Sequence, residues 1–215
     1  MNGTPSAWSQ SSLLASIPSN GSVSLSFQSG SPSQIQAFLS GHPRTMTCYA
    51  TYWHEPELDY TTMAQKANYR ATWASYGPAI RAAGCKPTLL LMRWSLSPSS
   101  GRNWRDWYPA GAVDVLGFDA YNAAAKHGTY GTGSDFISPI QAASAQTGLP
   151  WALGEVASDI PAGTSAGNRA AWAHSVAVAA AADPRFAFAE WWDQVSKDGS
   201  RDYRLDSAAA TSWQP

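Results

Sequence analysis

Four glutamates are the residues best placed to do chemistry in this chain of 215 residues. Glu55 and Glu57 follow one predicted strand, Glu155 ends another, and Glu190 lies near the end of the last. In a barrel of parallel strands, the carboxyl ends of the strands share one face, so acidic side chains from separated strands meet there. Two such carboxylates suit glycoside hydrolysis, in which one protonates the leaving oxygen while the other attacks the anomeric carbon or activates water. Their positions are also compatible with a structural role, in which Glu55 and Glu155 are carboxylates at the rim of the barrel that pair with arginine.

Metal and cofactor chemistry has little support in the sequence. Cys48 and Cys85 have no second cysteine or histidine at metal-ligand spacing, so we expect no metal site. They would pair if neighbouring strands brought them together, but two buried free thiols are the favoured expectation. The Gly-rich stretch Thr129–Ser134 lacks the Gly-Lys-Ser/Thr pattern of a phosphate loop, and we expect no cofactor.

The composition indicates which partners to expect. The net charge is −1 and no run of like charges occurs, which argues against a nucleic-acid partner or an anionic membrane surface and favours an uncharged partner. Only 13% of the residues are charged, whereas there are 11 Trp and 9 Tyr, a composition typical of the flat surfaces that bind sugar rings. No stretch of about 18 apolar residues is present, and Met1–Ser11 lacks the order of a signal peptide.

The predicted elements alternate along the chain. Period-two alternation and short apolar runs predict strands, and helical spacing of apolar residues predicts helices. The predicted strands are Ser22–Phe27, Thr45–Trp53, Pro87–Met92, Val113–Tyr121, Trp151–Val156 and Phe186–Trp192. The predicted helices are Ile35–Leu39, Met63–Ala83, Ile137–Gln146 and Asn168–Ala182.

Alternation of this kind predicts an α/β fold with a parallel sheet covered by helices, either a barrel or an open doubly wound sheet. The lack of a phosphate loop counts against the open-sheet nucleotide binder. No linker or repeat divides the chain, so we expect one domain over residues 1–215.

Four motifs occur in order at the spacing of βα units, and together they resemble a known group of enzymes. They are Trp53-His54-Glu55-Pro56-Glu57, the segment Val113–Asn122, Ala152-Leu-Gly-Glu155-Val, and Glu190-Trp191-Trp192-Asp193. This order resembles the clan A glycoside hydrolases, most closely glycoside hydrolase family 26, the β-mannanase family.

The resemblance implies a (β/α)8 TIM-barrel fold, a retaining mechanism and a polysaccharide or oligosaccharide substrate. Glu55 would be the general acid/base after the fourth strand, and Glu155 would be the nucleophile at the end of the seventh. A retaining mechanism implies carboxyl groups roughly 5–5.5 Å apart. Where the family's mannanases have Met-Asn after the acid, this chain has Pro56-Glu57, so the sugar is left open.

Further residues acquire roles from the same resemblance. His54 would orient the substrate beside the acid, and Tyr121 would hold the nucleophile ionised through a phenolic hydrogen bond. Trp191 or Trp192 would be the platform under the sugar. Strand alternation lets only one of these two face the mouth, and we favour Trp191 because it shares a face with small alanines, with Glu190 then pointing away.

Other candidates for the substrate face have two interpretations each. Trp53 and Trp94 lie near predicted strand ends, as do Trp104 and Trp107, and such aromatic residues either stack on sugar or fill the core. Asp119 and Arg93 are either ligand contacts or an ion pair between strands.

The strand count sets one more expectation. If Glu55 ends the fourth strand and Glu155 the seventh, Ser22–Phe27 is the third, with a helix over Met1–Ile17 before it, so the barrel lacks its first two βα units. Open edges at Ser22–Phe27 and Phe186–Trp192 then predict self-association. The resemblance also implies an extracellular location for a full-length parent, and the alternative to an enzyme is a non-catalytic carbohydrate-binding pseudoenzyme with the same groove.

Overall fold

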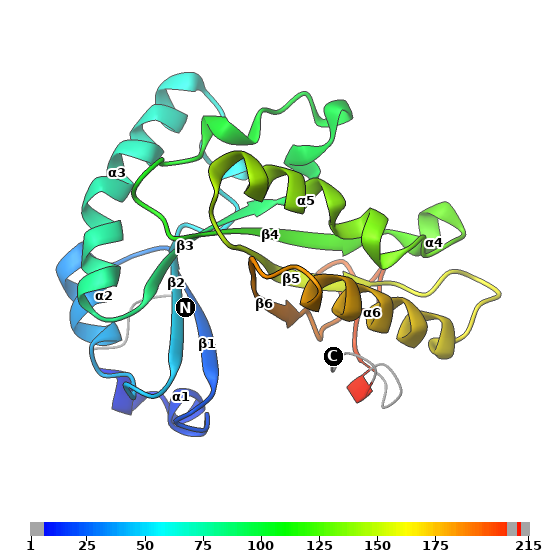
Figure 1. Ribbon diagram of the computed structural model, residues 1–215, viewed down its shortest axis with the longest axis horizontal. Coiled ribbons are helices and arrows are strands. Elements are labelled where there is room, and N and C mark those ends of the chain that lie inside the picture. The colour runs from blue at the N-terminus through cyan, green and yellow to red at the C-terminus, as the bar shows by residue number, and fades with distance from the viewer. Residues whose placement is uncertain (1–6, 206–209, 212–215) are drawn as a thin grey trace.

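A computed structural model describes residues 7–205, 210 and 211 and contains one six-stranded parallel sheet (Figure 1). The strands follow one another in chain order across the sheet, and each pairs in parallel with the next. They are β1 (Ser22–Phe27), β2 (Thr47–Tyr52), β3 (Lys86–Met92), β4 (Val115–Asn122), β5 (Trp151–Ser158) and β6 (Phe186–Trp191).

Helices connect the strands and cover the outside of the sheet. They are α1 (Ser12–Ala15), α2 (Pro32–Leu39), α3 (Met63–Ala82), α4 (Ala124–His127), α5 (Gly133–Thr147) and α6 (Ala166–Ala181). The sheet curls into a half-barrel, so the chain has an incomplete (β/α) TIM-barrel-type fold, as its sequence predicts. Among the described residues, no helix is long and apolar enough to span a membrane.

The N-terminal helix expected over Met1–Ile17 is wrong where the structure describes that segment. A 3-10 turn at Trp8–Gln10 is followed by the short helix α1, and Met1–Ser6 lie outside the described residues. The Ser11 side chain accepts a hydrogen bond from the Leu14 N–H and so starts a new helix. The 3-10 turn and α1 are therefore two separate elements rather than one continuous helix.

Both faces of the sheet carry apolar side chains, and their contacts show which face is the outer one and which is the inner one. The outer face packs against the helices, with Trp73 of α3 and Leu89, Leu91 and Phe118 of the sheet fully buried. On the inner face, Tyr49 of β2 reaches Phe188 of β6, with ring centroids 4.3 Å apart. The half-barrel is therefore filled at this level by two aromatic side chains from distant strands.

The sheet is least continuous between β2 and β3, where the ladder has two residue pairs, Tyr49 with Lys86 and Ala50 with Pro87. Cys48 and Cys85 form a disulfide at this point. The favoured expectation of two free thiols is therefore wrong. The reason is that Cys85 directly precedes β3, so the short ladder brings its side chain beside Cys48 on the neighbouring strand.

Replacing both cysteines with serine is expected to lower the free energy of unfolding by about 3–4 kcal/mol, because the bond closes a long loop in the unfolded chain. The two cysteines are 37 residues apart. Urea unfolding of the double variant and of the parent, each with and without dithiothreitol, measures the loss. A reductant that destabilises the double variant as much as the parent would show that the effect does not come from this bond.

Candidate active site

The loop after β2 places His54 and Glu55 at the carboxyl end of the half-barrel. Trp53 and Glu55 both have left-handed backbone conformations, with φ of 57° and 50°. Residues other than glycine rarely adopt this region, and such strain concentrates at functional sites. The Glu55 N–H donates to Leu90 O at 3.1 Å, so the strained loop is fixed to β3.

Glu57 connects the same loop to the segment that follows β3. Its side chain is 2% exposed, and Oε1 accepts hydrogen bonds from the Met92 N–H at 2.9 Å and the Ser95 hydroxyl at 2.8 Å. Glu57 therefore has a structural role and holds the loop after β2 against the end of β3.

A β-bulge directs Glu155 into the half-barrel. Phe118 pairs with Leu153, but the next residue, Asp119, pairs with Glu155, so Gly154 is the extra residue. Without the bulge, alternation from Leu153 would point Glu155 towards the helices. With it, the carboxylates of Asp119 and Glu155 project from adjacent strands into the same space.

Glycine at position 154 leaves room for this arrangement. An added Cβ there would lie 2.6 Å from Cδ2 of Leu90 and 2.7 Å from Oδ1 of Asp119. Gly117 on β4 leaves room for the same leucine side chain. Leu90 therefore forms the apolar floor beneath the acidic residues.

Two side-chain hydrogen bonds organise the acidic cluster. Nε2 of His54 contacts Oδ2 of Asp119, and the Tyr121 hydroxyl donates to Oε2 of Glu155. Burial opposes the charged imidazole, but the hydrogen bond and negative charge of Asp119 outweigh it and raise the pKa of His54 to about 9. His54 is therefore a cation at neutral pH.

The electrostatics of Glu55 differ from those of an exposed carboxyl. Burial and then the negative charge of Asp119 raise the pKa of Glu55 to about 7, although the positive charge of His54 acts in the opposite direction. Glu155 contributes to the same rise. The site thus holds a glutamate that is partly protonated near neutral pH and a second glutamate, held by a tyrosine, whose charge acts on the first.

Glu190 is a member of this cluster, which contradicts the expectation that it points away. It lines an inner cavity of about 190 Å³ together with His54, Glu155 and Trp192. Glu190 is exposed overall, but loss of water within the cavity and then the negative charge of Glu155 raise its pKa to about 7.

The error lies in which face of β6 is the inner one. Small alanines were expected inside, but the inner face carries Phe188, which meets Tyr49, and Glu190 follows two residues later. Trp191 packs its ring against Trp172 of α6, with centroids 6.2 Å apart, and its Nε1–H donates to Tyr203 O at 2.8 Å. Both Trp191 and Trp192 contribute to the cavity lining, so their platform roles stay predictions.

The remaining aromatic candidates divide between core and surface. Trp53 packs edge-on against Tyr60 and donates its Nε1–H to Asp59 at 2.7 Å, while Trp104 and Trp107 are buried. Trp94 is 54% exposed.

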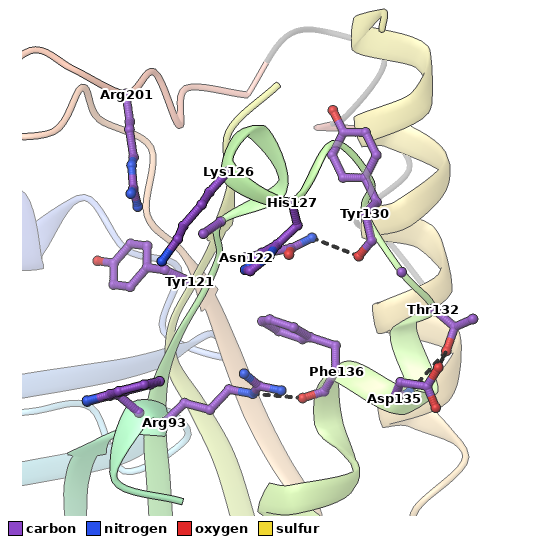
Figure 2. Close-up of a pocket in the computed structure, with 13 residues that line it drawn as sticks. Arg93, Tyr121, Asn122, Lys126, His127, Tyr130, Thr132, Asp135, Phe136 and Arg201 are labelled. Atoms are coloured by element: carbon purple, nitrogen blue, oxygen red, sulfur yellow. Dashed lines mark hydrogen bonds between the residues drawn. The ribbon is translucent and has the colours of Figure 1, made fainter. Parts of the chain in front are cut away.

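Trp94 lines a second cavity, of about 460 Å³, which also includes Tyr121 (Figure 2). Arg93 lies in the same cavity and donates to Phe136 O at 2.9 Å. Of the two interpretations of Arg93 and Asp119, the ion pair between strands is wrong, because Asp119 pairs with His54.

Two groups of described side chains have the composition of a metal site, and in one of them, His42 with Cys48 and Cys85, the disulfide occupies both sulfur atoms. The other group lies in the acidic cluster. One ligand atom each from His54, Asp119 and Glu155 lies within 4.8 Å of the others. However, Nε2 of His54 is already bonded to Asp119, and Glu155 accepts from Tyr121. A cation there would have to replace the proton of the imidazole, so the donor set fits an acid–base cluster better than a metal centre.

The buried carboxyl of Glu57 predicts a pH-dependent stability. Burial raises its pKa from 4.5 to about 7, against the hydrogen bonds from Ser95 and Met92. Its contribution to the free energy of unfolding is therefore present below about pH 4.5 and is lost as the pH rises to about 7. Thermal unfolding should show a higher Tm at pH 5 than at pH 8.

Glu57→Gln should reduce this difference in Tm, because the amide oxygen keeps the acceptor but cannot ionise. The raised pKa values of Glu55 and Glu190 act in the same direction, so part of the difference should remain. Asp114→Asn, on the exposed surface beside Arg81, is the matched control. An equal reduction in both variants would contradict the role of Glu57.

The fold is similar to that of several solved glycoside hydrolases. A GH128 subgroup II endo-β-1,3-glucanase from Pseudomonas viridiflava has a TM-score of 0.60 and 14% identity, covering 89% of this chain and 78% of its own. A GH128 subgroup I endo-β-1,3-glucanase from Amycolatopsis mediterranei, in complex with laminaritriose, has a TM-score of 0.52 and 14% identity, covering 91% and 98%. A GH26 β-mannanase from Bacteroides ovatus has a TM-score of 0.55 and 15% identity, covering 85% and 54%.

The chain therefore shares the fold of these glycoside hydrolases. No protein-family model matches its sequence, and neither does any curated protein. Family 26 is not distinguished from family 128 by these likenesses, because their TM-scores are similar.

Proposed function

We propose that this chain is a retaining glycoside hydrolase that cleaves a β-linked polysaccharide. The observation that supports the proposal is the electrostatic coupling of Glu55, on the loop after β2, to Glu155, on β5. Glu155 is turned inward by a bulge and bonded to Tyr121, and burial and nearby negative charge, including that of Glu155, raise the pKa of Glu55. A glutamate with a raised pKa matches an acid, and a glutamate held in place by a tyrosine hydrogen bond matches a nucleophile.

The first step of the proposed reaction forms a covalent intermediate. A carboxylate oxygen of Glu155 attacks the anomeric carbon, the glycosidic C–O bond breaks, and the proton of Glu55 moves to the leaving oxygen. Tyr121 donates its hydrogen bond to Oε2 of Glu155, which leaves the other oxygen to attack.

The second step releases the sugar. Glu55, now ionised, takes a proton from a water molecule, the water oxygen bonds to the anomeric carbon, and the bond to Glu155 breaks. His54 neutralises charge in the cluster and holds Asp119 beside both glutamates. Each turnover consumes one water and returns both glutamates to their starting forms.

The sugar and its linkage are proposed from the resemblance and the neighbours' activities. Family 26 implies a β-mannan, and the GH128 neighbours are β-1,3-glucanases. Trp94 and Trp192 are the aromatic side chains proposed to stack on the sugar rings, Trp94 because it is exposed and Trp192 because it lines the inner cavity.

A panel of β-1,4-mannan, β-1,3-glucan, mixed-linkage β-glucan and xylan tests the proposal by release of reducing ends. Proton NMR of the first product distinguishes retention, which yields the β-anomer, from inversion. Affinity for one of these glycans without release from any of them would favour the non-catalytic carbohydrate-binding alternative.

An extracellular location is proposed as well. The disulfide between Cys48 and Cys85 supports it, since such bonds persist in oxidising compartments. Self-association through the edges of β1 and β6 stays a proposal, because each edge strand has one neighbour in the sheet. Sedimentation velocity over a range of protein concentrations tests it, and a monomer throughout would contradict it.

A further inference from the structure

The larger cavity, of about 460 Å³, differs in charge from the acidic cluster that it adjoins. It lies where β3 and β4 end, between α4 and the start of α5, and Tyr121 belongs to both regions. We call it the basic cavity, after the three cationic side chains in its wall: Arg93, Lys126 and Arg201.

The cations approach from two sides. In Figure 2, Lys126 and Arg201 enter from one side and extend towards Tyr121, while Arg93 lies on the other side near Phe136. They come from segments far apart in sequence: the end of β3, the short helix α4 and the chain after β6. The fold therefore gathers positive charge at one place in a chain whose net charge is −1.

Little negative charge balances this group. Among the described residues, neither Arg93 nor Lys126 forms an ion pair with a carboxylate, and Arg201 lies 3.6 Å from Asp159. The carboxylate in the cavity wall belongs to Asp135, which accepts from the Thr132 hydroxyl at 2.7 Å at the start of α5. Two cations of the cavity thus lack an acidic partner within the part of the chain that the structure describes.

Arg93 is held in place by its neighbours while its terminal nitrogens stay available. Nε donates to Phe136 O at 2.9 Å, and the guanidinium carbon lies 4.6 Å from the centre of the Phe136 ring. No hydrogen bond within the described residues uses its terminal nitrogens. A guanidinium fixed in this way is suited to the planar oxygens of a carboxylate.

From these contacts we propose that the basic cavity binds the carboxylate of an acidic sugar, so that the substrate is a uronate-bearing β-glycan. This inference rests on the proposed function, because it places the acidic residue next to the sugar held between Glu55 and Glu155. Trp94, which is 54% exposed, lines the same cavity and stacks on that residue. The expectation of an uncharged partner, drawn from net charge, is replaced by this proposal.

Binding to matched pairs of oligosaccharides tests the inference. Each pair consists of a neutral oligosaccharide, from β-1,3-glucan or β-1,4-mannan, and the same chain oxidised at C6 to the uronate. Isothermal titration of the Glu155→Gln variant measures affinity without turnover. For at least one backbone the oxidised form should bind about tenfold more tightly, and the preference should fall as salt is added.

Substitutions locate the preference in the cavity. Lys126→Gln and Arg93→Gln, each in the same background, should reduce the ratio of the two affinities severalfold. Lys86→Gln is the matched control, because Lys86 is exposed at the opposite end of β3. Equal affinity for the two forms of every backbone, or an equal effect of the control, would overturn the inference.

The outcomes also separate this inference from the proposed function. Hydrolysis of neutral glycans without any preference for uronates overturns the basic cavity as a carboxylate site and leaves the hydrolase proposal intact. Tight, salt-sensitive binding of uronates without hydrolysis by the unsubstituted protein supports the cavity and contradicts the hydrolase.

Discussion

Glu155→Gln is expected to lower kcat by about four orders of magnitude or more, the scale seen when a reacting group is removed from other hydrolases. The amide keeps the size of the side chain and its oxygen still accepts from Tyr121, but it cannot attack the anomeric carbon. Affinity for the substrate, measured by calorimetry, should change little. Reducing-end release with the best glycan from the panel measures the loss.

Glu190→Gln is the control that distinguishes loss of the nucleophile from loss of one negative charge in the inner cavity. Glu190 lines the same inner cavity and interacts electrostatically with Glu155, so its replacement should lower the rate, but far less than Glu155→Gln does. A larger loss for Glu190→Gln than for Glu155→Gln would mean that the nucleophile has been assigned to the wrong strand.

Glu55→Ala is expected to slow hydrolysis of the natural glycan by about 10²–10⁴-fold, the usual contribution of a general acid or base. Aryl glycosides with a good leaving group need no proton at the first step, so their glycosylation step should be affected much less. Stopped-flow release of the aryl group reports on that step. Equal losses for both kinds of substrate would falsify the role of Glu55 as the acid.

The pH dependence of the parent provides a second check on Glu55. Its pKa is raised to about 7, so the fraction that carries the required proton falls as the pH rises through that value. The rate on the natural glycan should therefore decline above about pH 7, and Glu55→Ala should remove this limb of the profile. Retention of the limb in the variant would assign it to another group.

The sequence predicts the strands well because their residues have strong local signals. The apolar run Pro87–Met92 and the alternating Ser22–Phe27 correspond to β3 and β1 almost residue for residue. Because parallel strands in one sheet end on the same side, the placement of Glu55 and Glu155 on one face follows from strand order alone.

The directions of side chains near the strand ends are harder to predict. Strict alternation would place Glu155 on the helix side, and only the pairing of Asp119 with Glu155 reveals the bulge at Gly154. A glycine before a strand-end glutamate is the one local sign of it. The inner face of β6 depends on Phe188 meeting Tyr49, a contact between residues that are remote in sequence.

The grouping of positive charge in the basic cavity likewise results from the fold and is not visible in any single segment of the sequence. Lys126 lies among uncharged neighbours and Arg201 lies between Asp198 and Asp202, so neither belongs to a run of basic residues in the sequence. Their approach to Arg93 depends on where three separate connections cross the end of the sheet. The disulfide is similar, because two cysteines in apolar segments reveal their pairing only through the register of β2 and β3.

The short ladder between β2 and β3 has a consequence for local unfolding. Within the sheet, two residue pairs and one disulfide join β1 and β2 to β3. The loop with His54 and Glu55 continues from β2 and is held to β3 by single hydrogen bonds, such as that from the Glu55 N–H to Leu90 O. Reduction of the bond is therefore expected to let this unit open before the remainder unfolds. Amide hydrogen exchange should then accelerate in β1, in β2 and at Glu55, while β4 and β5, with Tyr121 and Glu155, stay protected. The acid and the nucleophile would thus belong to two cooperative units of unequal stability, and activity would be lost while most of the protein is still folded.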